Sequence, residues 1–119
     1  MHEKLVFVVD DNKPVANLIV SFLKEHGYDA IAFYDLAEAL AASASLHPDL
    51  LLSDFRMKTM DGLTLAMRLT ERHPACKVLM MTGLADEAIK HPAFKKFEWL
   101  HKPVSLSVLV DKVVGVLGS

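Results

Sequence analysis

Short runs of apolar residues alternate with amphipathic segments along the whole chain. Residues 5–9, 50–52 and 78–81 are almost continuously aliphatic, as parallel strands buried on both faces are. Residues 30–33 and 97–100 are shorter or more mixed, which favours positions at the two edges of a sheet. Five strands that alternate with helical patterns predict an α/β domain built on a parallel sheet.

The first helix has a clear start and end in the sequence. Asn12 can cap it, Pro14 is tolerated in its opening turn, and Gly27 ends it. The spacing puts four apolar residues on one face of this helix, Val15, Leu18, Ile19 and Phe22.

Three further helices begin at polar residues. Asp35 with Glu38 has the pattern of a capping box, while Asp61 and Ser105 are suitable caps for two later helices. In the last helix, the residues predicted to face the core are Leu106, Leu109, Val110, Val113 and Leu117.

Three His-Pro pairs punctuate the chain: His47-Pro48, His73-Pro74 and His91-Pro92. A residue before proline is disfavoured in helical dihedrals, so each pair is interpreted as a helix end rather than a histidine site. The third pair limits the fourth helix to residues 85–90, which is short for this architecture.

Composition restricts the function classes. The 119 residues are predicted to form a single domain, residues 1–119, and 52% hydrophobic with 24% charged residues is typical of a globular protein. A net charge of −2 argues against direct nucleic-acid binding, and the apolar runs are too short to span a membrane. A lone cysteine, Cys76, excludes an internal disulfide, and a cytoplasmic location is expected.

Polar residues with reactive side chains follow the apolar runs. Asp10 and Asp11 follow the first run, Asp54 the third, Thr82 the fourth and Lys102 the fifth. The carboxyl ends of parallel strands share one edge of the sheet, where ligands bind in open α/β folds. We therefore expect these five residues to meet in one site.

Three carboxylates at this edge require a cation. At about 4 Å and an effective dielectric near 20, each pair would repel by about 4 kcal/mol. Oxygen ligands without histidine or cysteine favour Mg²⁺ over Zn²⁺. An ionised Asp54 beside Mg²⁺ is a suitable nucleophile for a phosphoryl group, and Lys102 and Thr82 can bind the phosphoryl oxygens.

The sequence resembles the response-regulator receiver domains of two-component signalling over essentially its whole length. The resemblance is carried by Asp10-Asp11-Asn12, by Ser53-Asp54-Phe55-Arg56-Met57 with Met60-Asp61-Gly62, by Met81-Thr82-Gly83, and by His101-Lys102-Pro103. It implies a flavodoxin-like (βα)5 three-layer sandwich with strand order 2-1-3-4-5.

The resemblance also implies roles for individual residues. Asp11 and Asp54 would ligate Mg²⁺ directly, Asp10 would do so through water, and Arg56 would offer its backbone carbonyl. Lys102-Pro103 would be a cis peptide bond. Two residues, Thr82 and Trp99, would form the switch that responds to phosphorylation, although tryptophan is larger than the family's usual Tyr or Phe.

The implied function is a phosphoacceptor switch without turnover on other substrates. A histidine kinase or phosphotransfer protein would donate to Asp54, the acyl phosphate would hydrolyse, and a homodimer on phosphorylation is compatible with the family. Two alternatives are a degenerate receiver that acts only by protein interaction, and a flavin-binding or phosphatase enzyme of the same topology. The second alternative is disfavoured because the chain lacks a Gly-rich phosphate loop and has Arg56 where an aspartyl phosphatase needs an acid. The output partner is not evident from the sequence.

Overall fold

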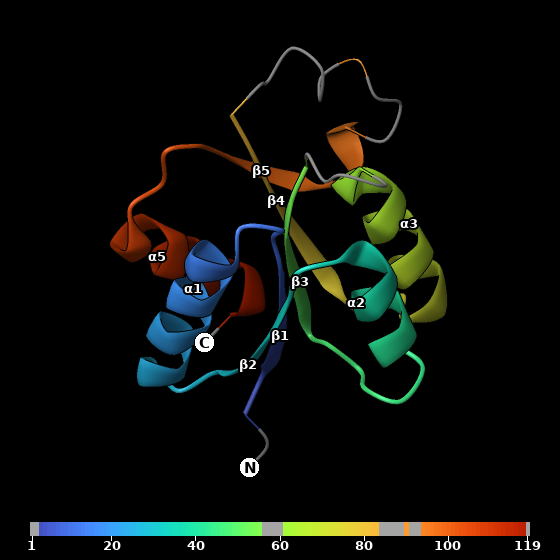
Figure 1. Ribbon diagram of the computed structural model, residues 1–119, viewed down its shortest axis with the longest axis horizontal. Coiled ribbons are helices and arrows are strands. Elements are labelled where there is room, and N and C mark those ends of the chain that lie inside the picture. The colour runs from blue at the N-terminus through green and yellow to red at the C-terminus, as the bar shows by residue number, and fades with distance from the viewer. Residues whose placement is uncertain (1–2, 56–60, 84–89, 91–93, 119) are drawn as a thin grey trace.

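The computed structural model describes residues 3–55, 61–83, 90 and 94–118, and its strands form one parallel sheet (Figure 1). The strands are β1 (Leu5–Val9), β2 (Asp29–Phe33), β3 (Leu50–Asp54), β4 (Lys77–Thr82) and β5 (Glu98–His101). Their order is β2-β1-β3-β4-β5, which confirms the two predicted edge strands. The boundaries differ slightly from the prediction, because Asp54 and Thr82 are the last residues of their strands.

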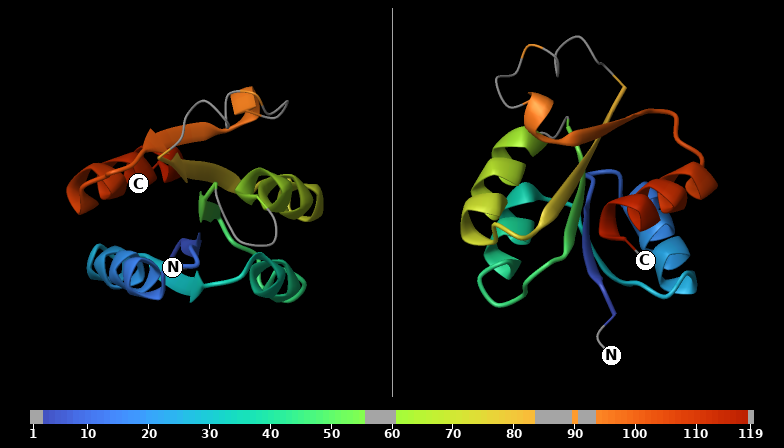
Figure 2. Two further views of the ribbon diagram at one scale, coloured as in Figure 1. Left: turned by 45° about the horizontal axis from the view of Figure 1, so that its top comes forward. Right: turned by 180° about the vertical axis from the view of Figure 1, so that it is seen from behind.

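Helices cover both faces of this sheet. α1 (Lys13–Glu25) and α5 (Leu106–Leu117) lie on one face, and α2 (Leu36–Ala42) and α3 (Gly62–Arg72) on the other, so the predicted three layers are confirmed (Figure 2). A 3-10 turn, η1 (Phe94–Lys96), precedes β5. The short fourth helix predicted at residues 85–90 lies outside the described residues except at Lys90.

All four predicted N-caps are confirmed. In each case a side-chain oxygen accepts a backbone N–H that the first helical turn would otherwise leave unpaired. The acceptors are Asn12, Asp35, Asp61 and Ser105, and their donors are Val15, Ala37, Thr64 and Val108. Each cap determines the residue at which its helix begins after the preceding loop.

The core has one cluster on each face of the sheet. On the α1 and α5 side, α5 contributes Leu109, Val110 and Val113 as predicted, with Leu106 and Leu117 half-buried against the same cluster.

The buried face of α1 matches the prediction only in part: Ile19 is buried and Phe22 is half-buried against the core, as predicted. Its buried residues are Ala16, Ile19 and Leu23, whereas Val15 is 37% and Leu18 57% exposed. Ala16 and Leu23 are buried in place of Val15 and Leu18. Two apolar side chains therefore remain at the surface beside α5.

The first two His-Pro pairs follow the ends of helices. α3 ends at Arg72 with His73 as its C-cap, as predicted, and α2 ends at Ala42, before His47. The His47 and His73 rings pack edge to face with centroids 4.4 Å apart. The third pair, His91-Pro92, lies outside the described residues. Within the described part of the chain, no helix combines the length and apolar character needed to cross a membrane.

Candidate functional site

Three aspartates meet at the carboxyl-terminal edge of the sheet, as the sequence predicts. Asp10 directly follows β1, Asp11 comes next, and Asp54 is the last residue of β3. Carboxylate oxygens of the three residues all lie within 4.8 Å of one another. Because β1 and β3 are neighbours in register, Val9 pairing with Ser53, the sheet itself determines this convergence.

Lys102 reaches the same carboxylates from the end of β5. Its Nζ lies 3.2 Å from Asp54 Oδ2 and 3.6 Å from Asp10 Oδ2. Its backbone N–H donates to the Thr82 carbonyl oxygen at 2.9 Å, which ties this loop to β4. The peptide bond to Pro103 is cis, which confirms the expectation from the family resemblance.

Burial leaves the carboxylates short of partners. Desolvation raises the pKa of Asp54 above the ordinary aspartate value, Lys102 opposes this rise, and the charges of Asp10 and Asp11 add to it. Asp10 is 1% exposed; its Oδ1 accepts the Asn12 N–H at 2.9 Å. Its Oδ2 has no hydrogen-bond partner among the described residues, since the Lys102 contact is too long for one.

The donor set fits a small divalent cation. Three carboxylates, one with an unsatisfied buried oxygen, are the hard ligands that Mg²⁺ prefers, and a single lysine cannot neutralise three negative charges. Asp10, Asp11 and Asp54 are the described residues that would hold the ion. Arg56, predicted to offer its backbone carbonyl, lies outside the described residues.

The two predicted switch residues occupy different environments. Thr82 is 2% exposed at the end of β4, next to the backbone of Lys102. Trp99 is half-buried in the edge strand β5 and packs against the core cluster on the α2 and α3 face. Its ring contacts Phe55, the residue after Asp54, with centroids 5.8 Å apart and an interplanar angle of 62°.

Gly62 is a site neighbour that the sequence interpretation treated as a helix start only. A Cβ at this position would lie 2.3 Å from the Asp54 carbonyl oxygen and 2.6 Å from the Met80 methyl carbon. The Gly62 N–H also donates to the Phe55 carbonyl at 2.8 Å. The Asp-Gly pair soon after Asp54 is the sequence signal, but the close approach depends on how α3 packs.

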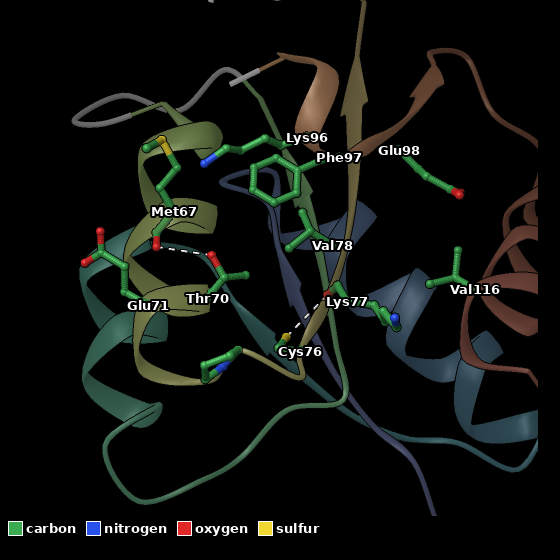
Figure 3. A pocket seen from close by; sticks show the side chains of 11 residues that line it. Met67, Thr70, Glu71, Cys76, Lys77, Val78, Lys96, Phe97, Glu98 and Val116 are labelled. Atoms are coloured by element: carbon green, nitrogen blue, oxygen red, sulfur yellow. Dashed lines mark hydrogen bonds between the residues drawn. The ribbon is translucent and has the colours of Figure 1, made fainter. Parts of the chain in front are cut away.

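Of two grooves, one adjoins the site and the other lies at the opposite end of β4, and neither is lined by the three carboxylates. One, of about 490 Å³, lies between α1 and the start of α5 and is lined by Leu18, Leu106, Leu109 and, at its rim, Lys102. The other, of about 480 Å³, lies at the start of β4 beside α3 and the segment that leads into β5, and its lining includes Phe97 (Figure 3). It also contains Cys76, but burial raises the pKa of that thiol to about 12, so it stays protonated.

Comparison with known proteins gives a consistent result. The sequence matches the family described as response regulator receiver domain over residues 6–114. It is 37% identical over 115 residues to the DNA-binding transcriptional regulator NtrC of Escherichia coli K12, covering 95% of this chain and 24% of that protein. The chain therefore spans about a quarter of the length of this relative.

Shorter relatives and solved structures match from end to end. The response regulator receiver protein CpdR of Brucella abortus is 31% identical over 116 residues, covering 96% of this chain and 97% of that one. A CheY-like receiver domain from Methanospirillum hungatei has a TM-score of 0.86 at 22% identity, covering 98% and 95% of the two chains. CheY4 of Vibrio cholerae has a TM-score of 0.84 at 25% identity, covering 97% and 99%.

Proposed function

The chain belongs to the response regulator receiver domain family, and we propose that it works as a switch that accepts a phosphoryl group on Asp54. One observation carries this proposal: the Asp54 carboxylate lies at the sheet edge with two further carboxylates and a lysine ammonium 3.2 Å from its Oδ2. Such an arrangement holds a nucleophile, sites for a cation and a group that binds phosphoryl oxygens.

The proposed reaction moves a phosphoryl group from a donor histidine to Asp54. An Asp54 carboxylate oxygen forms a bond to phosphorus while the P–N bond of the phosphohistidine breaks, and the electron pair of that bond returns to the imidazole. Asp54 must be ionised to attack, and the Lys102 ammonium favours that form. Lys102 then binds the phosphoryl oxygens as a compact positive charge, and the Thr82 hydroxyl donates to one of them.

Asp10, Asp11 and Asp54 would hold Mg²⁺, with Arg56 offering its carbonyl. When bound, this ion neutralises negative charge on the phosphoryl oxygens and on the crowded carboxylates. The chain carries out only its own phosphorylation and the hydrolysis that resets it, so it is not an enzyme for other substrates.

The donor is proposed to be a histidine kinase or a phosphotransfer protein. The groove between α1 and α5 is suited to its apolar surface, because Leu18 is 57% exposed there and Lys102 belongs both to the groove and to the site. A partner seated on this groove would have its histidine close to Asp54. Because the NtrC relative is about four times longer than this chain, a covalently linked output module is a further proposal.

Intact mass after incubation with a small acyl phosphate, with and without Mg²⁺, tests the function. The wild type should gain one labile phosphoryl mass only with Mg²⁺, and Asp54→Asn should gain none. Asp35→Asn is the matched control, since asparagine is an equally good N-cap for α2 and the site is untouched. If the wild type gains no phosphoryl mass, the proposal fails and the alternative, a receiver that acts only through protein interaction, takes its place.

A further inference from the structure

The aromatic residue after the phosphoacceptor touches the aromatic residue of the edge strand. Phe55 is 7% exposed, and its ring meets that of Trp99 edge to face, with centroids 5.8 Å apart. β3 and β5 are separated by β4, so their backbones are about 10 Å apart at the usual strand spacing. The two side chains therefore lean toward each other across β4.

Phe55 is held by its backbone on both sides. Its N–H donates to the Met81 carbonyl of β4 at 2.8 Å, and its carbonyl accepts the Gly62 N–H at 2.8 Å. The preceding carbonyl, of Asp54, accepts the Ser53 hydroxyl at 3.0 Å and faces Gly62 so closely that a Cβ there would lie 2.3 Å away. The peptide that joins Asp54 to Phe55 is thus enclosed, and Asp54 cannot shift its main chain without displacing Phe55.

A phosphoryl group would disturb this arrangement from the Asp54 side. It carries up to two negative charges in place of the single charge of the Asp54 carboxylate, and it brings three acceptor oxygens. These would compete for Lys102, whose Nζ lies 3.2 Å from Asp54 Oδ2 and 3.6 Å from Asp10 Oδ2. Any shift of Asp54 that results is passed to Phe55, because the two residues share a peptide bond.

We infer that Phe55 is a positioning residue that transmits the state of Asp54 to Trp99 through direct ring contact. The inference rests on the proposed function and adds a route that does not pass through the Thr82 hydroxyl. It also explains how a side chain as large as tryptophan can respond at this position: its ring contacts the Phe55 ring directly, so Trp99 moves when Phe55 moves.

Trp99 is the only tryptophan of the chain, so its fluorescence is a specific reporter. The experiment measures phosphoryl mass and Trp99 emission in the same samples, with a small acyl phosphate and Mg²⁺. Phe55→Leu removes the ring, Phe55→Tyr retains it, and Phe97→Leu is the control, since Phe97 is a half-buried aromatic on the same face of the sheet but away from Asp54. Phe55→Met replaces Phe55→Leu if thermal unfolding shows that the leucine variant is not folded.

In Phe55→Leu, phosphoryl uptake should stay within about twofold of wild type while the emission change on phosphorylation falls at least about threefold. Phe55→Tyr should restore the emission change, and Phe97→Leu should retain it. A merely structural role for Phe55 would lower uptake and emission change together.

The inference is overturned if Phe55→Leu takes up the phosphoryl group and keeps the full emission change, or if wild type is phosphorylated with no emission change at all. In both cases the phosphoacceptor function of Asp54 stands. Absence of phosphoryl mass on wild type overturns the function and the inference together, and the mass measurement separates this outcome from the other two.

Discussion

The strand that carries the reacting group and the strand that carries the reporter differ in burial. All five residues of β3 are buried, and Asp54 lies at its end. In β5, Glu98 and His101 are exposed, and Trp99 and Leu100 are half-buried. β3 has neighbours on both sides and β5 on one. The reacting group is thus built into a rigid interior, whereas the reporter lies where a modest rearrangement costs little.

Two contacts link the regions that follow or include these strands, and each can be removed by a single substitution. Lys102 follows β5 and forms an ion pair with Asp54, and Phe55 follows β3 and packs on Trp99. One link is electrostatic, and its lysine also lines the groove between α1 and α5. The other link is apolar and lies on the α2 and α3 side. Loss of the first should affect chemistry, and loss of the second should affect the response.

The largest effect is expected from Lys102→Met. This change removes the ammonium 3.2 Å from Asp54 and should slow phosphoryl uptake by about 100-fold, comparable to the loss of a donor that stabilises transition-state charge. The measurement is the rate of mass gain with a small acyl phosphate. Lys112→Met is the control, because it removes the same charge from an exposed pair with Glu98 and should leave the rate unchanged.

Gly62→Ala should disturb the close packing at the buried end of β3. The new methyl group would meet the Asp54 carbonyl and the Met80 side chain, and such overpacking should lower the free energy of unfolding by about 2 kcal/mol. Gly115→Ala is the matched control. Apart from the adjacent residues and the backbone of α5, no atom of the described residues lies within 4 Å of a Cβ there, so alanine should stabilise α5 by about 0.5 to 1 kcal/mol. Urea denaturation of both variants checks this, and equal effects would contradict the close packing at Gly62.

Much of the site could be predicted because it depends on strand ends. Uninterrupted aliphatic runs such as residues 50–52 fix which strands are central, and parallel pairing then brings together the polar residues that follow them. The helix caps were equally predictable, because a cap such as Asp61 depends on its own first helical turn.

Contacts that depend on the packing of separate elements could not be predicted. The prediction for the buried face of α1 was wrong for Val15 and Leu18, since periodicity alone does not say that Ala16 and Leu23 are buried in their place. Likewise the contact of Gly62 with Asp54 and that of Phe55 with Trp99 join residues from different elements. These contacts follow from helix placement and strand twist, which a single sequence does not specify.

Leu18→Glu tests whether the groove between α1 and α5 binds the phosphoryl donor. A charge on this 57% exposed side chain should reduce the rate of phosphoryl transfer from a phosphohistidine protein about tenfold, because it opposes an apolar partner surface. Uptake from a small acyl phosphate should not change. Val108→Glu, at a 52% exposed position of α5 outside the groove, should leave both rates unchanged. Equal loss in both variants would indicate a general effect of added charge instead of docking.

The smallest effect concerns the stability of the interior site. Burial and the charges of Asp10 and Asp11 raise the pKa of Asp54, so the folded state holds this proton more tightly than the unfolded state does. Wild type therefore loses stability relative to Asp54→Asn as pH rises from the ordinary aspartate pKa through the raised one, and the difference stays constant above it.

Near neutral pH and without metal, Asp54→Asn should melt about 4 °C higher than wild type. Carboxylates away from the site titrate alike in both proteins and cancel in the difference. Mg²⁺ should raise the melting temperature of wild type more than that of the variant, because only wild type has all three carboxylates to be neutralised. If the melting temperatures are equal at every pH, charge crowding at Asp54 does not reduce stability.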